Sequence, residues 1–159
     1  MSASSPLSSS LEDYLETIYI LILEKNAARV KDISQSLSVN YSSVTGALRS
    51  LSDKNLVNYA PYELVTLTAK GKNIGKEIYR RHRAIKNFFV KVLAVDEKLA
   101  EDSACKMEHA ISLEIIDRLV KFSEYIERCP KGIAHWDESH GFSCLYKEDN
   151  PACTKCREA

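Results

Sequence analysis

The chain of 159 residues has only five glycines and four prolines, the residues that interrupt helices. Long apolar runs are also absent, because the longest, Ile18 to Leu23, is far shorter than a bilayer span. The Ser-rich start, residues 1–10, has neither the basic residues nor the apolar centre of a signal peptide, so we expect a disordered leader. These absences predict a mainly helical protein of the cytoplasm.

The net charge is zero, but the charges are divided along the chain. Residues 25–91 hold 13 Lys and Arg against 4 Asp and Glu, whereas residues 92–159 hold 9 against 14. A basic segment of this size is a candidate for nucleic-acid binding. Clustering on solvated helix faces would give the same counts, so a DNA-binding motif inside the segment has to decide between the two interpretations.

Residues 30–53 have the pattern of a helix-turn-helix. Apolar residues at helical spacing mark its two helices: Val30, Ile33 and Leu37, then Val44, Leu48 and Leu51. Between them, Asn40 or Ser42 can cap the second helix. The polar face of that helix is small enough to enter the major groove, with hydroxyls and one guanidinium to contact phosphates or base edges. The DNA-binding candidates are therefore Asn40, Ser42, Ser43, Thr45, Gly46 and Arg49.

Elements on both sides extend this motif to a winged helix over residues 11–71. A capping-box sequence, Ser9 to Glu12, begins an apolar helical period that continues to about Lys25. Residues 56–59 and 64–67 are predicted to form a two-stranded hairpin around a turn that contains Pro61. The first domain is therefore expected to bind DNA.

Residues 72–128 are predicted to form a helical metal-binding and dimerisation domain. A long helix begins near Thr68, and further helices are expected from Glu97 to about Ala110 and from Ser112 to about Glu127. They carry more apolar surface than one small helical layer needs, which indicates a homodimer.

Cys105, Glu108 and His109 have the spacing i, i+3 and i+4, which places three donors on one helix face. Sulfur, oxygen and nitrogen together suit Fe(II), Co(II) or Zn(II) better than Mg(II) or Ca(II). A solvated Glu–His pair and a small core cysteine would show the same pattern. A catalytic zinc or iron centre is a further alternative, although the winged helix argues against an enzyme.

The remaining cysteines, Cys129, Cys144, Cys153 and Cys156, all lie in the tail of residues 129–159. Cysteines in the cytoplasm are expected to be thiols or metal ligands rather than disulfides. The tail could bind zinc or an iron-sulfur cluster through these four residues, or carry four reduced thiols. An iron-sulfur or redox sensor in the tail is therefore an alternative source of regulation.

Five segments of the chain match a known family in order. They are Leu11–Tyr19, Ser42–Thr45, Leu67–Gly71, Arg81–Arg83 and Cys105–His109. Together they resemble the diphtheria-toxin-repressor and manganese-transport-regulator (DtxR/MntR) family of transcriptional regulators, with a likeness that runs from about Leu11 to Glu127. The resemblance implies a homodimer that binds a palindromic operator when a divalent metal is present and represses metal-uptake genes.

The same resemblance implies the metal ligands. They are Asp13, Glu16, His82, Cys105, Glu108 and His109, with Glu101 as a possible further ligand. Asp13 and Glu16 match the manganese branch, whereas Cys105 is a cysteine in the iron-dependent repressors and a glutamate in the manganese branch. The thiolate favours Fe(II) over Mn(II), which stays the alternative. Without the resemblance, Asp13 and Glu16 could equally be surface acids at a helix start, and His82 a solvated side chain.

Overall fold

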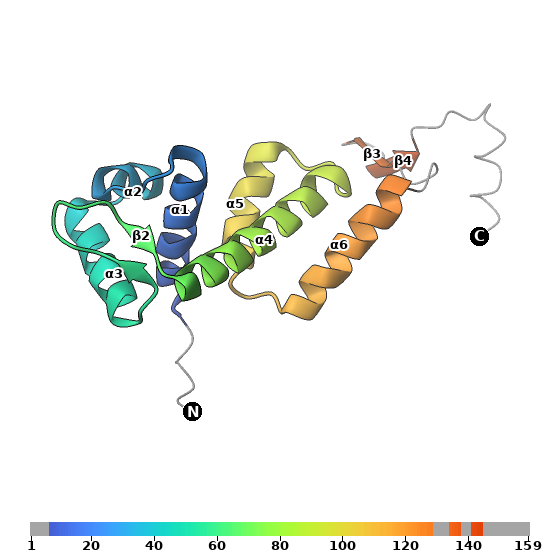
Figure 1. Ribbon diagram of the computed structural model, residues 1–159. Coiled ribbons are helices and arrows are strands. Elements are labelled where there is room, and N and C mark those ends of the chain that lie inside the picture. Colours follow the sequence, from blue (N-terminus) through green and yellow to red (C-terminus); the bar gives the residue numbers. More distant parts are fainter. Residues whose placement is uncertain (1–6, 129–133, 138–140, 145–159) are drawn as a thin grey trace. The chain divides into compact units, whose positions relative to one another are not determined.

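The computed structural model describes residues 7–128, 134–137 and 141–144. The chain forms two compact units that divide between Arg80 and Arg81, inside helix α4. The first unit contains α1 (Ser9–Lys25), α2 (Val30–Leu37), α3 (Tyr41–Asp53), β1 (Val57–Asn58), β2 (Thr66–Leu67) and the start of α4 (Ala69–Lys91) (Figure 1). The second contains the rest of α4, α5 (Glu97–Met107), α6 (Leu113–Arg128), β3 (Ala134–Asp137) and β4 (Gly141–Cys144).

The first unit has the predicted helix-turn-helix. The inward faces of α1, α2 and α3 supply its core, in which Leu15, Ile33, Val44 and Leu48 are fully buried. The Asn40 side chain accepts a hydrogen bond of 2.8 Å from the Ser43 backbone N–H, so Asn40 is the N-cap of α3. The cap of α1 is Ser8, one residue before the predicted capping box.

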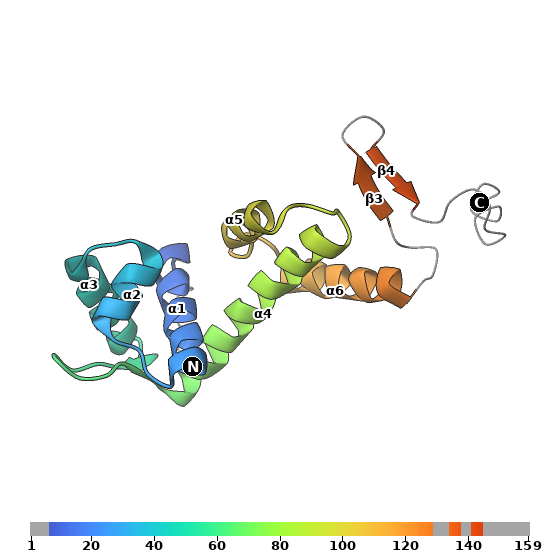
Figure 2. The same cartoon turned by 90° about the horizontal axis from the view of Figure 1, so that it is seen from above.

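The wing is an antiparallel hairpin, but its strands are shorter than the sequence predicted. Val57 pairs with Leu67 and Asn58 with Thr66, and an isolated bridge joins Val65 to Ala28. The loop between β1 and β2 projects from the helices (Figure 2). Thr68 ties the base of the wing to α4, because its hydroxyl donates to the Asn55 carbonyl at 2.8 Å and accepts from the Gly71 N–H at 3.0 Å. A winged helix-turn-helix is therefore confirmed.

The second unit is built on a small helical core. Ile85 of α4, Ala104 of α5 and Ile116 of α6 are fully buried there. The Asp96 side chain caps α5 and accepts from the Lys98 N–H at 2.9 Å. The helix ends at Met107, earlier than the predicted end near Ala110, so Glu108 is its C-cap and His109 lies in the following turn. The predicted mainly α fold, a winged helix followed by a helical domain, is confirmed.

A hairpin that the sequence did not predict follows α6. Strand β3 pairs with β4 in antiparallel register, from Ala134 opposite Cys144 to Asp137 opposite Gly141. The predicted tail ligands Cys129, Cys153 and Cys156 lie outside the described residues, so the tail metal site stays a prediction.

Among the described helices, none has both the length and the hydropathy of a membrane-spanning segment.

Candidate metal centre

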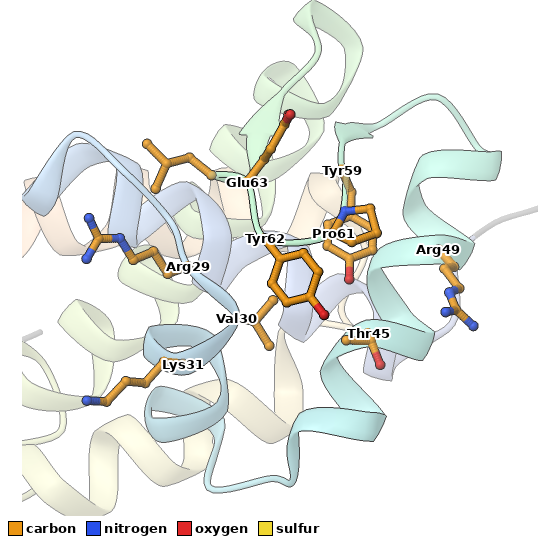
Figure 3. Close-up of a pocket in the computed structure, with 10 residues that line it drawn as sticks. Arg29, Val30, Lys31, Thr45, Arg49, Tyr59, Pro61, Tyr62 and Glu63 are labelled. Carbon is orange, nitrogen blue, oxygen red and sulfur yellow. The ribbon is translucent and has the colours of Figure 1, made fainter.

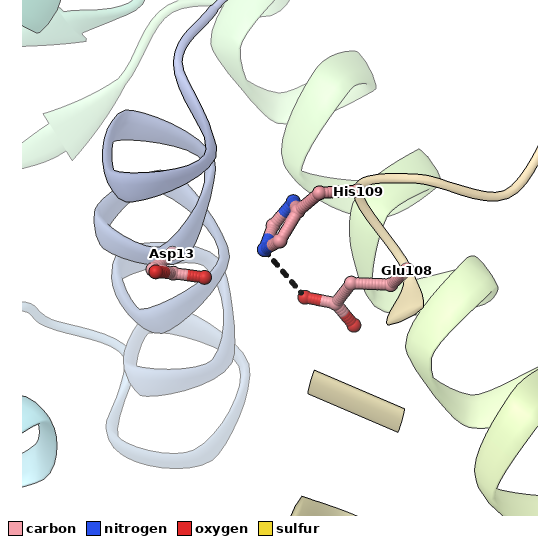
Figure 4. A group of neighbouring side chains, drawn as sticks. All are labelled: Asp13, Glu108 and His109. Carbon is pink, nitrogen blue, oxygen red and sulfur yellow. Dashed lines mark ion pairs between the residues drawn. The ribbon is translucent and has the colours of Figure 1, made fainter. Parts of the chain in front are cut away.

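Glu108 is the only fully buried charged residue in the part of the chain that the structure describes. Its Oε2 atom lies 2.7 Å from Nδ1 of His82, and its Oε1 atom lies 3.4 Å from Nε2 of His109 (Figure 4). Among the described residues, no group hydrogen-bonds to that Oε1 atom. Burying a carboxylate costs free energy unless positive charge or hydrogen bonds compensate it, so this position favours a cation or protonated imidazoles.

Helical spacing explains how these side chains reach the interior. His82 lies four residues after Ile78 and three before Ile85, both fully buried, so all three share the inward face of α4. His82 itself is only 8% exposed, which excludes the solvated alternative. Glu108 lies four residues after the buried Ala104 and continues the inward face of α5.

A second carboxylate contacts the other side of the His82 ring. Nε2 of His82 lies 3.0 Å from Oε1 of Glu101, and Oε2 of Glu101 lies 2.7 Å from the Lys86 ammonium. Partial burial raises the pKa of Glu101, but the hydrogen bond from Lys86 and the charges of His82 and Lys86 outweigh it and hold that pKa below its ordinary value. The Glu101 hydrogen bond and charge raise the pKa of Lys86. Glu101 is therefore a charged carboxylate that accepts from both neighbours.

The other predicted ligands lie apart from this cluster or in the first unit. Cys105 is exposed, and no set of three candidate ligand atoms within 4.8 Å of one another includes it among the described residues. The inward face of α5 carries Ala104 and Glu108, so the spacing that was expected to group all three donors leaves the thiol outside. Asp13 and Glu16 lie on α1. Their part in the centre, like that of Cys105, stays a prediction.

The donors that the second unit does bring together fit a transition-metal ion. Each oxygen of the Glu108 carboxylate lies beside one imidazole, and this pairing of nitrogen with oxygen is one that borderline ions such as Fe(II), Mn(II) and Zn(II) accept. His82, Glu108 and His109 do not form a set of three ligand atoms within 4.8 Å of one another, so the two imidazoles do not converge on one point. Mg(II) and Ca(II) prefer all-oxygen sites. A cation would also occupy the neighbourhood of the Glu108 oxygen that receives no hydrogen bond among the described residues.

The residues predicted to bind DNA lie at the N-cap of α3 and along the helix, and their contact with DNA stays a prediction. Ser42, Ser43, Gly46 and Arg49 are exposed, whereas Thr45 is half-buried. Asn40 is used within the chain, because its side-chain oxygen accepts from both serines at 2.7 to 2.9 Å. No atom lies within 4 Å of a Cβ placed on Gly46, so packing does not require a glycine there.

A cavity of about 690 Å³ lies beside these residues, between the start of α2, α3 and the wing (Figure 3). Three of its lining side chains are basic: Arg29, Lys31 and Arg49. Tyr62, also in the lining, is fully exposed in the wing and has a left-handed backbone with φ 67°. Sequence reasoning did not select Arg29, Lys31 or Tyr62, although two cations at a helix start and a tyrosine in a wing are signals it could have used.

Comparisons with known proteins agree with both units. The family described as "Iron dependent repressor, N-terminal DNA binding domain" matches residues 6–65, and "Iron dependent repressor, metal binding and dimerisation domain" matches residues 68–137. An uncharacterized HTH-type transcriptional regulator of Methanocaldococcus jannaschii is 44% identical over 119 residues, which cover 74% of this chain and 95% of that protein. The chain belongs to the iron-dependent repressor family.

Solved structures of metal-dependent regulators in this family have the same fold. IdeR of T. acidophilum superposes with a TM-score of 0.65 at 27% identity, covering 83% of this chain and 59% of that one. The manganese regulator SloR gives a TM-score of 0.65 at 29% identity, covering 86% and 63%. This chain therefore spans about three-fifths of the length of those two proteins.

Family membership confirms the resemblance to metal-dependent repressors. The family and these relatives are transcriptional regulators, so the chain is a regulator of this kind and not an enzyme. The mononuclear metalloenzyme considered for Cys105, Glu108 and His109 is thereby set aside.

Proposed function

We propose that this chain represses metal-uptake genes by binding a palindromic operator as a homodimer when Fe(II) is present. The observation that carries the proposal is the fully buried Glu108 carboxylate between His82 and His109, in a chain whose first unit is a winged helix. In a purely structural core, an apolar side chain would avoid the free energy that burial of a carboxylate costs. A bound cation gives a reason for the buried carboxylate, because it compensates the charge.

We assign the ligands to residues of both units. Glu108, His82 and His109 belong to the second unit, and Asp13 and Glu16 of α1 supply further oxygen donors from the first. A bound divalent cation would neutralise these carboxylates and so let residues of both units share one ligand sphere. Carboxylates brought to the same ligand sphere without a cation repel one another, which lowers the population of arrangements that fit the operator. Metal affinity and operator affinity must then rise together.

Exposed apolar side chains of α5 and α6 support the homodimer. They are Leu99, Met107, Leu113, Ile115 and Phe122. Large apolar side chains that are exposed on two neighbouring helices are typical of a protein interface. A dimer also supplies the two recognition helices that a palindromic operator requires.

Cys105 is the residue on which we base the choice of Fe(II). A thiolate binds later transition ions more strongly than a carboxylate does, and the Irving–Williams order already places Fe(II) above Mn(II). Mn(II) is the second candidate, because Asp13 and Glu16 are hard oxygen donors and SloR, a manganese regulator, has a similar fold. Since the thiol is exposed in this structure, the experiment has to establish whether it joins the ligands.

Metal dependence is tested by operator binding in anaerobic titrations of each ion. The probe is a duplex selected from a random pool by the Fe(II)-loaded protein. We expect no operator binding in chelator, a stronger response to Fe(II) than to Mn(II), and a shift of this ratio toward Mn(II) in Cys105→Glu. Equal operator affinity in chelator and in metal would contradict the proposal, and an unchanged ratio in Cys105→Glu would remove the thiolate from the choice of metal.

Arg49→Ala is expected to weaken operator binding by about 1–3 kcal/mol, the usual value of one specific arginine contact. The side chain is exposed on α3 and lines the cavity beside the wing, so its loss leaves the core intact. Operator affinity is measured by fluorescence anisotropy and the oligomeric state by sedimentation. Arg118→Ala, which removes an exposed arginine of α6, is the control; equal effects of the two substitutions would mean that only general charge matters.

A further inference from the structure

His82 has a carboxylate at each ring nitrogen, and the two carboxylates differ in environment. Glu108, 2.7 Å from Nδ1, is fully buried, whereas the side chain of Glu101, 3.0 Å from Nε2, is 50% exposed. Glu101 is also bound through its other oxygen to Lys86, at 2.7 Å. Lys86 lies one helical turn after His82 on α4, so the imidazole and the ammonium approach Glu101 from the same helix.

We propose that Glu101 and Lys86 position His82 for the ion: Glu101 accepts the hydrogen on Nε2, so the lone pair on Nδ1, beside Glu108, is left for the metal. The inference rests on the proposed metal centre and adds to it which nitrogen binds. A neutral imidazole carries one ring hydrogen, and the hydrogen bond made by one nitrogen decides which nitrogen is free to bind a metal. Glu101, considered a possible ligand from the sequence, is thereby assigned to the outer layer of the centre.

Lys86 is the residue that separates the roles of the two carboxylates. Its ammonium already compensates the charge of Glu101, and a metal cation at the same carboxylate would meet that positive charge a few ångströms away. The contacts given for the Glu108 carboxylate are with imidazoles, and the Arg81 guanidinium donates to the backbone carbonyl of Glu108 at 3.2 Å. The fixed positive charge therefore directs the cation to Glu108 and leaves Glu101 as a hydrogen-bond acceptor.

The hydrogen position is tested directly in the full-length protein loaded with diamagnetic Zn(II). Long-range ¹H–¹⁵N spectra distinguish the protonated ring nitrogen from the metal-bound one. Single substitutions to Gln at His109, His135 and His140 identify the signals of His82 among the four histidines of the chain. We expect the hydrogen of His82 on Nε2. A hydrogen on Nδ1, with Nε2 bound to zinc, would overturn the proposal without any substitution at Glu101 or Lys86.

Metal affinity, measured for Zn(II) and Co(II) by competition with a chromophoric chelator, provides the second test. Glu101→Ala should weaken binding by about 10–100-fold, as is usual for residues that orient a metal-bound histidine. Glu101→Gln should lose much less, because its amide oxygen still accepts the Nε2 hydrogen, and Lys86→Arg should stay close to the parent. Glu114→Gln, in an exposed ion pair with Arg118, is the matched control and should bind metal as the parent does.

The results separate this inference from the metal centre itself. If Glu101→Gln and Glu101→Ala lose as much affinity as Glu108→Gln, Glu101 is a ligand and the positioning role is wrong. Parent-like affinity in Glu101→Ala, together with a large loss in Glu108→Gln, would leave the metal centre in place and overturn only the positioning role. Parent-like affinity in Glu108→Gln would overturn the proposed metal centre and this inference with it.

Discussion

Glu108→Gln is expected to abolish the response of operator binding to metal and to lower metal affinity by more than about a hundredfold, beyond the usual effect of outer residues. The amide has the shape of the carboxylate, and its N–H can donate to the lone pair on Nδ1 of His82, so the fold should be kept. It removes the negative charge that a divalent cation requires. Metal affinity is measured by chelator competition and operator binding by anisotropy, on the same preparations.

Two further measurements make this result specific. Circular dichroism and sedimentation must show that Glu108→Gln has the helix content and oligomeric state of the parent. Glu114→Gln makes the same chemical change on the exposed face of α6 and should leave both affinities unchanged. If Glu108→Gln still needs metal for operator binding and binds the metal with the affinity of the parent, Glu108 is not part of the metal centre.

Gly71→Ala is expected to destabilise the first unit by about 3 kcal/mol or more, the upper range for overpacked sites. A Cβ at this position would lie 1.8 Å from the Leu56 carbonyl oxygen and 2.7 Å from its carbon. Both atoms belong to the backbone at the base of the wing, so rotation of a side chain cannot relieve the clash. The Thr68 hydroxyl fixes the same approach through its bonds to Gly71 and Leu56. Urea unfolding measures the loss.

Gly46→Ala is the control, because a Cβ there meets no atom within 4 Å. Alanine in an exposed helix interior stabilises by about 0.5–1 kcal/mol relative to glycine, so this variant should resist urea better than the parent. Its operator binding should nevertheless fall, since a methyl group would stand on the face that we propose enters the major groove. Destabilisation by Gly46→Ala, or parent-like stability of Gly71→Ala, would contradict the packing described here.

Much of the first unit could be predicted because its determinants are local. The capping side chain of Asn40 and the apolar spacing of Val44, Leu48 and Leu51 fix α3 without reference to the rest of the chain. The wing was predicted in type but not in length, since strand ends depend on pairing partners distant in sequence. The hairpin of β3 and β4 was missed for the same reason.

The candidate centre shows where local spacing stops being sufficient. Cys105, Glu108 and His109 have helical spacing, but the inward face of α5 carries Ala104 and Glu108, and His109 lies after the helix has ended. Burial then separates an exposed thiol from a fully buried carboxylate. No local signal reveals that Glu101 would contact both His82 and Lys86, because those contacts join residues of α4 and α5 that are 15 or more positions apart.

By itself the sequence determined the helical class, the helix-turn-helix with its polar recognition face, and the residue types that can bind a transition metal. These follow from helical periodicity, capping and donor chemistry, all of which act over a few neighbouring residues. Only the tertiary structure decided which donors meet. The packing of α4 against α5 buries Glu108 beside His82 and places Lys86 on Glu101, because the inward faces of the two helices must share one small core.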